Sequence, residues 1–209
     1  MMYEYEKDGA AIYRASFATI RAEAHLGNIS PTLERVVVRM IHACGMVDLP
    51  REIASSPGAA EIGRDALASG ARILCDGQMI AAGITRARLA ARNTIVCTLG
   101  DPGVPALAAS LRTTRSAAAV ELWREQIDGA VIAIGNAPTA LFHLLELLAS
   151  SHERPAVVLG FPVGFIGAAE SKIALATNGL GVPFITLHGR RGGSALATAA
   201  INALAQDDE

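Results

Sequence analysis

Aromatic residues are scarce in this sequence. Five Phe, three Tyr and one Trp make up 4% of the 209 residues, although the hydrophobic fraction as a whole reaches 51%. The core must therefore consist mainly of Ala, Val, Ile and Leu, a composition that suits strands packed closely against Ala-rich helices. A chain of this length can bury a substantial core, and we interpret residues 1–209 as one domain.

Long apolar runs are missing as well. No uninterrupted apolar stretch approaches the roughly 18 residues of a membrane-spanning helix. The first residues, MMYEYEKDG, lack the basic and then apolar pattern of a secretory signal. We therefore expect a cytoplasmic protein without a membrane partner.

Cysteine is rare, and its distribution argues against structural disulfide bonds and metal sites. Cys44, Cys75 and Cys97 are odd in number and isolated, and each lies inside an apolar run. This pattern is typical of buried small side chains in a reducing compartment rather than of a disulfide framework. The histidines other than His42 show no mutual ligand spacing and have no cluster of Cys or carboxylates beside them. We expect no metal site.

Lysine is almost absent, because only Lys7 and Lys172 of the 18 basic residues are lysines. The formal net charge of -2 argues against a nucleic-acid-binding protein, which normally carries a basic excess. GC-rich coding is one sufficient explanation of the arginine bias. The bias also suits a ligand rich in carboxylates, because the guanidinium pairs with them in a bidentate manner.

From residue 71 onward, short apolar runs alternate with Ala-rich helical stretches. The runs are ARILCD at 71–76, NTIVCTLG at 93–100, GAVIAIGN at 129–136, PAVVLGFP at 155–162 and VPFITLHG at 182–189. Strands that alternate with helices predict right-handed βαβ units and a parallel sheet covered on both faces. We therefore predict a doubly wound, three-layer α/β/α fold, with a five-stranded, mainly parallel sheet in residues 71–206 and extra N-terminal helices in residues 1–70.

In such sheets, ligands bind outside the carboxyl ends of the strands, so the turns after the strands deserve most weight. Asp76 and Asp101 lie in two of these turns, where a carboxylate usually caps the next helix. The last turn, GRRGGS at 189–194, resembles an anion-binding loop. It matches neither the dinucleotide fingerprint nor the P-loop. A nicotinamide or ATP enzyme is therefore disfavoured, and we expect no cofactor.

The N-terminal region contains a strongly patterned helix at 30–45. Ser30 is placed to cap it, Pro31 to begin it and Gly45 to end it. Its apolar stripe comprises Leu33, Val36, Val37, Met40, Ile41 and Cys44. His42 lies on the opposite face with Arg35 and Arg39. From the pattern alone, a solvated face is the commoner explanation of such a histidine.

A second helix is predicted at 8–25, and Ser16 falls on its apolar face. The hydroxyl of such a serine most often bonds back to the carbonyl one turn earlier, and position alone favours that interpretation. A functional contact is the alternative.

Seven blocks of the chain together resemble the precorrin-8X methylmutase family of cobalamin biosynthesis. They are YRASFATIRAE at 13–23, VVRMIHACGMVDL at 37–49, ILCDGQMIAAGI at 73–84, TRSAAAVELW at 114–123, GNAPTAL at 135–141, GFPVGFIGAAESK at 160–172 and GRRGGSALATAAINAL at 189–204. The resemblance covers essentially the whole chain, and the order of the blocks makes it specific.

The resemblance implies an isomerase that moves a methyl group between neighbouring carbons of a tetrapyrrole macrocycle. It implies conversion of precorrin-8X to hydrogenobyrinic acid, or of the cobalt analogue to cobyrinic acid, by a cofactor-independent homodimer. By the same resemblance, His42 exchanges a proton with the substrate, and Ser16 and Arg39 contact it. Further substrate-binding candidates are Thr85, Arg115, Arg190 and Arg191, the three arginines because of their positions in loops.

Two other function classes stay open at this point. A tetrapyrrole carrier would bind the product stoichiometrically without isomerising anything. A methyltransferase that uses S-adenosylmethionine would need a glycine-rich turn after the first strand of the repeat, and the residues there are DGQM at 76–79.

Overall fold

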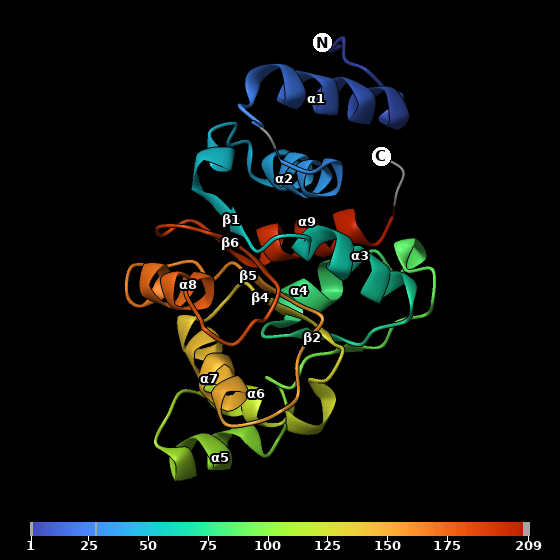
Figure 1. Cartoon of the computed structure of the whole chain (residues 1–209). Coiled ribbons are helices and arrows are strands. Elements are labelled where there is room, and N and C mark those ends of the chain that lie inside the picture. The colour runs from blue at the N-terminus through green and yellow to red at the C-terminus, as the bar shows by residue number, and fades with distance from the viewer. Residues whose placement is uncertain (1, 28, 207–209) are drawn as a thin grey trace.

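The computed structural model describes residues 2–27 and 29–206, and its centre is a six-stranded sheet (Figure 1). The strands are β1 (Ile53–Ser55), β2 (Ile73–Cys75), β3 (Ile95–Val96), β4 (Val131–Ile134), β5 (Val157–Gly160) and β6 (Phe184–Leu187). Their order across the sheet is β1-β6-β5-β4-β2-β3, and every neighbouring pair from β6 to β3 is parallel. The five predicted strands and the doubly wound α/β fold are confirmed.

The sixth strand, β1, was not predicted, and it lies in the region expected to be helical only. It pairs antiparallel with β6, with Ile53 opposite Leu187 and Ser55 opposite Ile185. Phe184 extends the pairing, because its backbone N–H donates to the Ser56 hydroxyl at 3.0 Å. The expected five-stranded sheet is thus six-stranded, with one antiparallel edge.

Helices cover both faces of the sheet (Figure 1). One face carries α3 (Ala59–Ala68), α4 (Gln78–Gly83) and α9 (Ser194–Leu204). The other carries α5 (Val104–Leu111), α6 (Arg115–Glu121), α7 (Pro138–Ala149) and α8 (Ala168–Ala176). Three 3-10 turns, η1 (Leu49–Glu52), η2 (Arg86–Arg88) and η3 (Arg124–Gln126), complete the connections. The three predicted layers are therefore present.

Two N-terminal helices form a further layer outside α9. α1 (Gly9–Glu23) packs on α2 (Pro31–Cys44), and α2 packs on α9 (Figure 1). The predicted signals of α2 are confirmed: the Ser30 side chain accepts a hydrogen bond from the Leu33 N–H, and Gly45 ends the helix with a left-handed φ of 72°. An L side chain rarely adopts that conformation, which is why glycine suits this position.

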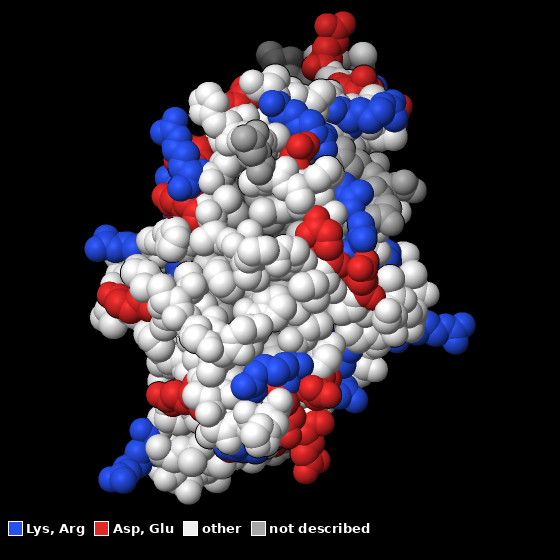
Figure 2. Space-filling view, in the orientation of Figure 1, with Lys and Arg blue, Asp and Glu red and all other residues white. Residues whose placement is uncertain are grey.

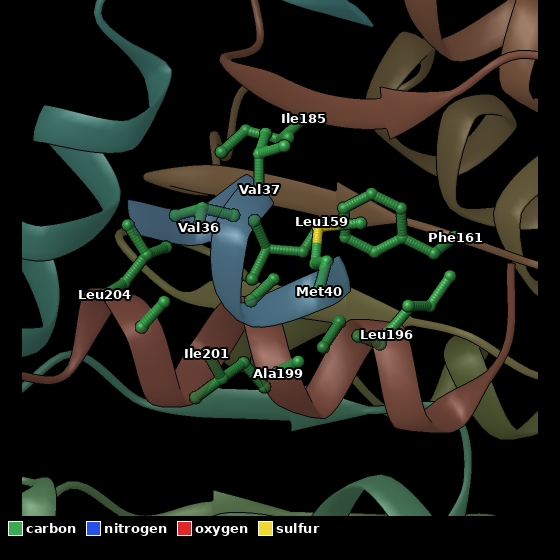
Figure 3. Close-up of a cluster of buried hydrophobic side chains, with 14 of the residues drawn as sticks. Val36, Val37, Met40, Leu159, Phe161, Ile185, Leu196, Ala199, Ile201 and Leu204 are labelled. Atoms are coloured by element: carbon green, nitrogen blue, oxygen red, sulfur yellow. The ribbon is translucent and has the colours of Figure 1, made fainter. Parts of the chain in front are cut away.

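The apolar stripe of α2 joins the extra layer to the core of the domain. Val36, Val37 and Met40 are fully buried. Figure 3 shows them among side chains of α9 and of strands β5 and β6, with Ile185, Leu159 and Ile201 nearby. Burial of each such aliphatic side chain contributes about 1.5–3 kcal/mol. The stripe therefore fixes the height of α2 above the sheet and, with it, the position of the opposite, polar face.

Few charged side chains lie in the middle of one face of the molecule. On the face of Figure 2, the Lys and Arg side chains lie close to Asp and Glu near the periphery, around a broad uncharged middle. Among the described residues, no helix is both long enough and apolar enough to cross a membrane.

Candidate functional site

His42 lies on the last turn of α2 and faces α1. Its Nδ1 is 2.8 Å from the Ser16 hydroxyl oxygen. The Phe17 ring meets the imidazole edge-to-face, and the Tyr13 ring lies tilted beside it, each with its centroid 5.2 Å away. The Ser16 hydroxyl thus has its partner on another helix, instead of the back-bond that position alone favoured. One hydrogen bond and two rings orient the imidazole.

Arg39 lies one turn before His42 on the same face. Its guanidinium sits over the Phe17 ring, 5.4 Å from the centroid, a distance suited to a cation–π contact. Arg39 and His42 line one cavity of about 360 Å³. The structure therefore brings Ser16, Arg39 and His42 together, as the resemblance implied, although it does not test their roles.

The opposite wall of this cavity, which we call the His42 cavity, comes from α4 and from one face of α9. It consists of Met79, Gly83, Ser194, Ala195, Thr198, Ala199 and Asn202. Met79 follows β2, and Ser194 follows β6. Both wall elements therefore start at the carboxyl ends of parallel strands, where ligands bind in such sheets. Met79 is 74% exposed.

The GRRGGS loop sets where α9 begins. The Gly193 N–H donates to the Phe161 carbonyl at 2.7 Å. At Gly192 an added Cβ would lie 2.2 Å from that same oxygen, so only glycine allows the loop to approach so closely. The loop is thus packed against the backbone that follows β5, and the Gly193 N–H is one of the groups that hold it there.

The side chain of Lys172 bonds to the backbone of the same loop. The side chain is fully buried, and its ammonium donates to the Arg191 carbonyl. Burial lowers the pKa of Lys172 to about 8, and the nearby Glu52 carboxylate opposes that effect. A buried ammonium is tolerated only where hydrogen bonds and an opposite charge compensate its lost hydration. This lysine, unlike the histidines, was not singled out as a candidate from the sequence.

Asp76 braces the turn after β4. Its two carboxylate oxygens accept hydrogen bonds from the N–H groups of Gly135, Asn136 and Ala137 at 2.8–3.0 Å. Burial raises the pKa of Asp76, and the three N–H groups oppose that rise. The expectation that Asp76 caps the helix after its own strand is wrong, because its partners belong to a neighbouring strand's turn. Asp101 does not cap the next helix either: it accepts at 2.7 Å from the N–H of Gly103, a residue that precedes α5, and no side chain of the described residues caps that helix.

Thr85 lies next to the His42 cavity. Its backbone N–H donates to Oδ1 of Asn202 at 2.9 Å, and the amide of Asn202 donates to the Gly83 carbonyl at 3.1 Å. Both Asn202 and Gly83 line the cavity. The Thr85 backbone therefore lies at the edge of the His42 cavity, and contact of its side chain with substrate stays a prediction.

Arg190 and Arg191 lie at a second cavity, of about 270 Å³, together with Cys44, Val163 and Phe165. The Arg190 guanidinium sits over the Phe165 ring, 5.2 Å from its centroid. Nη2 of Arg191 is 2.8 Å from Asp48, and this contact raises the pKa of Arg191 and lowers that of Asp48. The Arg191 guanidinium is thus paired within the chain. Its partner, Asp48, lies 143 residues away in the sequence, so no local pattern reveals the contact.

Arg115 lies apart from both cavities. The expectation that it lies in a loop is wrong, because it is the first residue of α6, which Thr114 caps by accepting from the Ala117 N–H. Nη2 of Arg115 lies 3.5 Å from the Leu99 carbonyl oxygen. The side chain is exposed. Roles for Arg115, Arg190 and Arg191 in binding substrate remain predictions.

Comparisons with known proteins agree on one family. The family model described as precorrin-8X methylmutase matches residues 11–207. The precorrin-8X methylmutase of Pseudomonas aeruginosa is 59% identical over 208 residues, which cover 100% of both chains. The cobalt-precorrin-8 methylmutase of Priestia megaterium is 39% identical over 170 residues, 81% of this chain and 75% of the relative. Among solved structures, the precorrin-8X methyl mutase from Thermus thermophilus has a TM-score of 0.86 at 42% identity and covers 94% of this chain and 95% of that chain.

Proposed function

The chain belongs to the precorrin-8X methylmutase family, and we propose that the His42 cavity is where it moves a methyl group on its tetrapyrrole substrate. The protein is an isomerase of cobalamin biosynthesis, and the methyltransferase alternative falls away. Its substrate in this proposal is precorrin-8X and its product hydrogenobyrinic acid, because the relative with 59% identity carries the precorrin-8X name.

The hydrogen bond between Ser16 and His42 carries the assignment of residues. In an isomerisation the bond from the methyl group to one ring carbon breaks as its bond to the neighbouring carbon forms, so no atom is gained or lost. A proton lent to the macrocycle must be returned, and an imidazole can do both near neutral pH. Ser16 engages Nδ1, which leaves Nε2 to exchange that proton.

Arg39 and the walls of the cavity would hold the substrate still. A methyl shift of this kind needs a fixed geometry and the right tautomer more than it needs a nucleophile. The acetate and propionate arms of the macrocycle call for guanidinium partners. Arg39 is half-buried beside His42, and the exposed side chains of Met79 and Tyr13 offer apolar surface for the macrocycle.

We further propose that two copies of the chain associate, with the exposed apolar residues of the loop after β5 at their interface. Phe165 is 83% exposed and Ile166 is 91% exposed, and Val163 beside them is 48% exposed. Contiguous apolar residues of this size on a surface usually mark an interface. Light scattering should give a dimer mass for the wild type and a monomer mass for Phe165→Asp/Ile166→Asp.

A cytoplasmic location belongs to the same proposal. Cys44, Cys75 and Cys97 are all free thiols, and free thiols persist where the compartment is reducing.

A single-turnover assay tests the catalytic assignment. Enzyme in excess over precorrin-8X should form the corrin chromophore of hydrogenobyrinic acid, which visible absorbance follows. His42→Ala should lose at least about 100-fold of the rate, the usual contribution of a general acid–base group. His25→Ala is the matched control, because His25 is an exposed histidine just beyond α1. Unchanged turnover in His42→Ala would refute the role, and binding without conversion by the wild type would indicate a carrier.

A further inference from the structure

A third cavity, of about 560 Å³, lies between α1 and η2. One stripe of α1 and one residue of η2 line it: Ala10, Tyr13, Arg14, Phe17, Ala18, Arg21 and Arg88. We call it the α1 cavity. It adjoins the site already described, because Tyr13 and Phe17 contact His42 with their rings. Its three arginines are not among the residues that the sequence suggested.

The three guanidiniums differ in how they are compensated within the protein. Arg21 is 2.9 Å from Glu34, and the largely exposed Arg14 is 4.0 Å from Asp8. Arg88 has no ion pair within residues 2–27 and 29–206, and its Nη1 is buried there without a hydrogen-bond partner. A guanidinium nitrogen that has lost water and gained no acceptor raises the free energy of the unliganded protein.

A carboxylate in the α1 cavity would compensate the charge of the Arg88 guanidinium, which no acidic side chain of residues 2–27 and 29–206 neutralises. Arg88 is half-buried, so a carboxylate beside it would meet a charge that solvent screens only in part. The planar guanidinium can bind both oxygens of a carboxylate. The aromatic wall next to it would contact the flat apolar surface of a ring. The cavity therefore suits a ligand that combines an extended ring with a carboxylate arm, rather than a small inorganic anion.

We infer that Arg88 binds a carboxylate arm of the tetrapyrrole at the edge of the macrocycle that extends past Tyr13 and Phe17 into the α1 cavity. This inference rests on the proposed function, and it adds a subsite that α1 and η2 line beside the His42 cavity. The macrocycle would then span the imidazole, with Arg39 and Arg88 on different parts of its rim.

Equilibrium titration with hydrogenobyrinic acid tests the subsite. Arg88→Met should raise the Kd roughly 10-fold or more, the effect of losing a charge-assisted contact with the carboxylate. Arg86→Met is the matched control, since Arg86 belongs to the same 3-10 turn, is exposed and does not line the cavity. Its Kd should equal that of the wild type. The Kd of Arg88→Lys should lie between those of the wild type and Arg88→Met, because an ammonium keeps the charge and loses the bidentate geometry.

A second measurement separates ligand binding from a structural role. Because the buried Nη1 of Arg88 has no partner among the described residues, Arg88→Met without ligand should unfold at the same temperature as the wild type or at a higher one. When hydrogenobyrinic acid is added, the unfolding temperature of Arg88→Met should rise less than that of the wild type. If Arg88→Met is unstable, the Kd of Arg88→Lys decides. Equal affinities of wild type, Arg88→Lys and Arg88→Met would overturn the subsite and leave the proposed function standing. Failure of the wild type to bind or convert any tetrapyrrole would refute the proposed function itself.

Discussion

The Ser16 hydroxyl of α1 and Nδ1 of His42 on α2 are 2.8 Å apart, so the imidazole is oriented by a helix other than its own. Phe17, the next residue along α1, is buried and contacts the same ring edge-to-face. The contact between the two helices therefore does two things at once, since it buries apolar surface and restrains the imidazole. Loss of Ser16 should affect the restraint and spare most of the burial.

Ser16→Ala should lower the rate of methyl migration about 10- to 100-fold, as removal of an orienting hydrogen bond to a functional group commonly does. The half-buried hydroxyl contributes little to folding, so the unfolding temperature should stay within a few degrees of the wild type. Thr19→Ala is the control, because Thr19 is an exposed hydroxyl residue of the same helix. Equal rates for Ser16→Ala and Thr19→Ala would show that the hydrogen bond is incidental.

Asp76→Asn should lower the free energy of unfolding by about 1–3 kcal/mol, because an amide offers one acceptor oxygen where the carboxylate offers two. The NH2 group would then face N–H donors of the turn at 135–137. Urea denaturation measures the change. Asp101→Asn removes an exposed carboxylate that accepts from one N–H group, and it should cost less. A larger loss in Asp101→Asn would contradict the bracing role of Asp76.

Lys172 should make stability rise with pH above about 8. Its pKa is about 8 in the folded protein, against an ordinary value of 10.5. Between these values the unfolded chain binds more protons than the folded one, so the free energy of unfolding increases with pH. Relative to Lys172→Met, the wild type should gain about 1 kcal/mol for each pH unit in this window. Below pH 8 the difference between the two should be constant.

Chemical denaturation of wild type and Lys172→Met at pH 7, 8, 9 and 10 measures this dependence. Lys7→Met is the control, since Lys7 is exposed and the chain has no other lysine. The Lys7→Met and wild-type curves should be parallel across the range. Parallel curves for Lys172→Met would mean that the buried ammonium keeps its ordinary pKa.

Gly192→Ala should displace the GRRGGS loop. The new methyl group would lie 2.2 Å from the Phe161 carbonyl oxygen and 2.6 Å from that of Pro162, both backbone atoms. We expect a loss of about 2 kcal/mol or more in the free energy of unfolding, as for other insertions into packed structure. Gly179→Ala, where the methyl group meets nothing within 4 Å, should be nearly neutral. Equal stabilities of the two variants would be incompatible with the close approach of this loop.

Features that depend on a few neighbouring residues could be predicted from the sequence. The cap at Ser30, the start at Pro31 and the left-handed end at Gly45 are local signals, and all three are confirmed. The five parallel strands were also found, because each is a short apolar run between turn residues. The position of α2 over α9 follows from its apolar stripe.

Features that depend on distant partners could not be predicted. β1 has three half-buried residues and no apolar run, and it exists as a strand because β6 lies beside it. Asp76 bonds to amides about 60 residues away, and Lys172 reaches across to the Arg191 carbonyl. Arg88 shows the same limit for the site, since only folding places it opposite α1. The periodicity of apolar residues predicts which face of a helix or strand a residue occupies, but it does not predict which other part of the chain packs against that face.

The two edges of the sheet bear on how this protein avoids aggregation. The β1 edge strand is three residues long and runs antiparallel to its neighbour, and β3 at the other edge has two residues. Strands this short expose few unpaired backbone groups, so neither edge is a template on which another chain can add a strand. Any assembly of this protein should therefore use side-chain surfaces, and its concentrated solutions should resist amyloid-like growth.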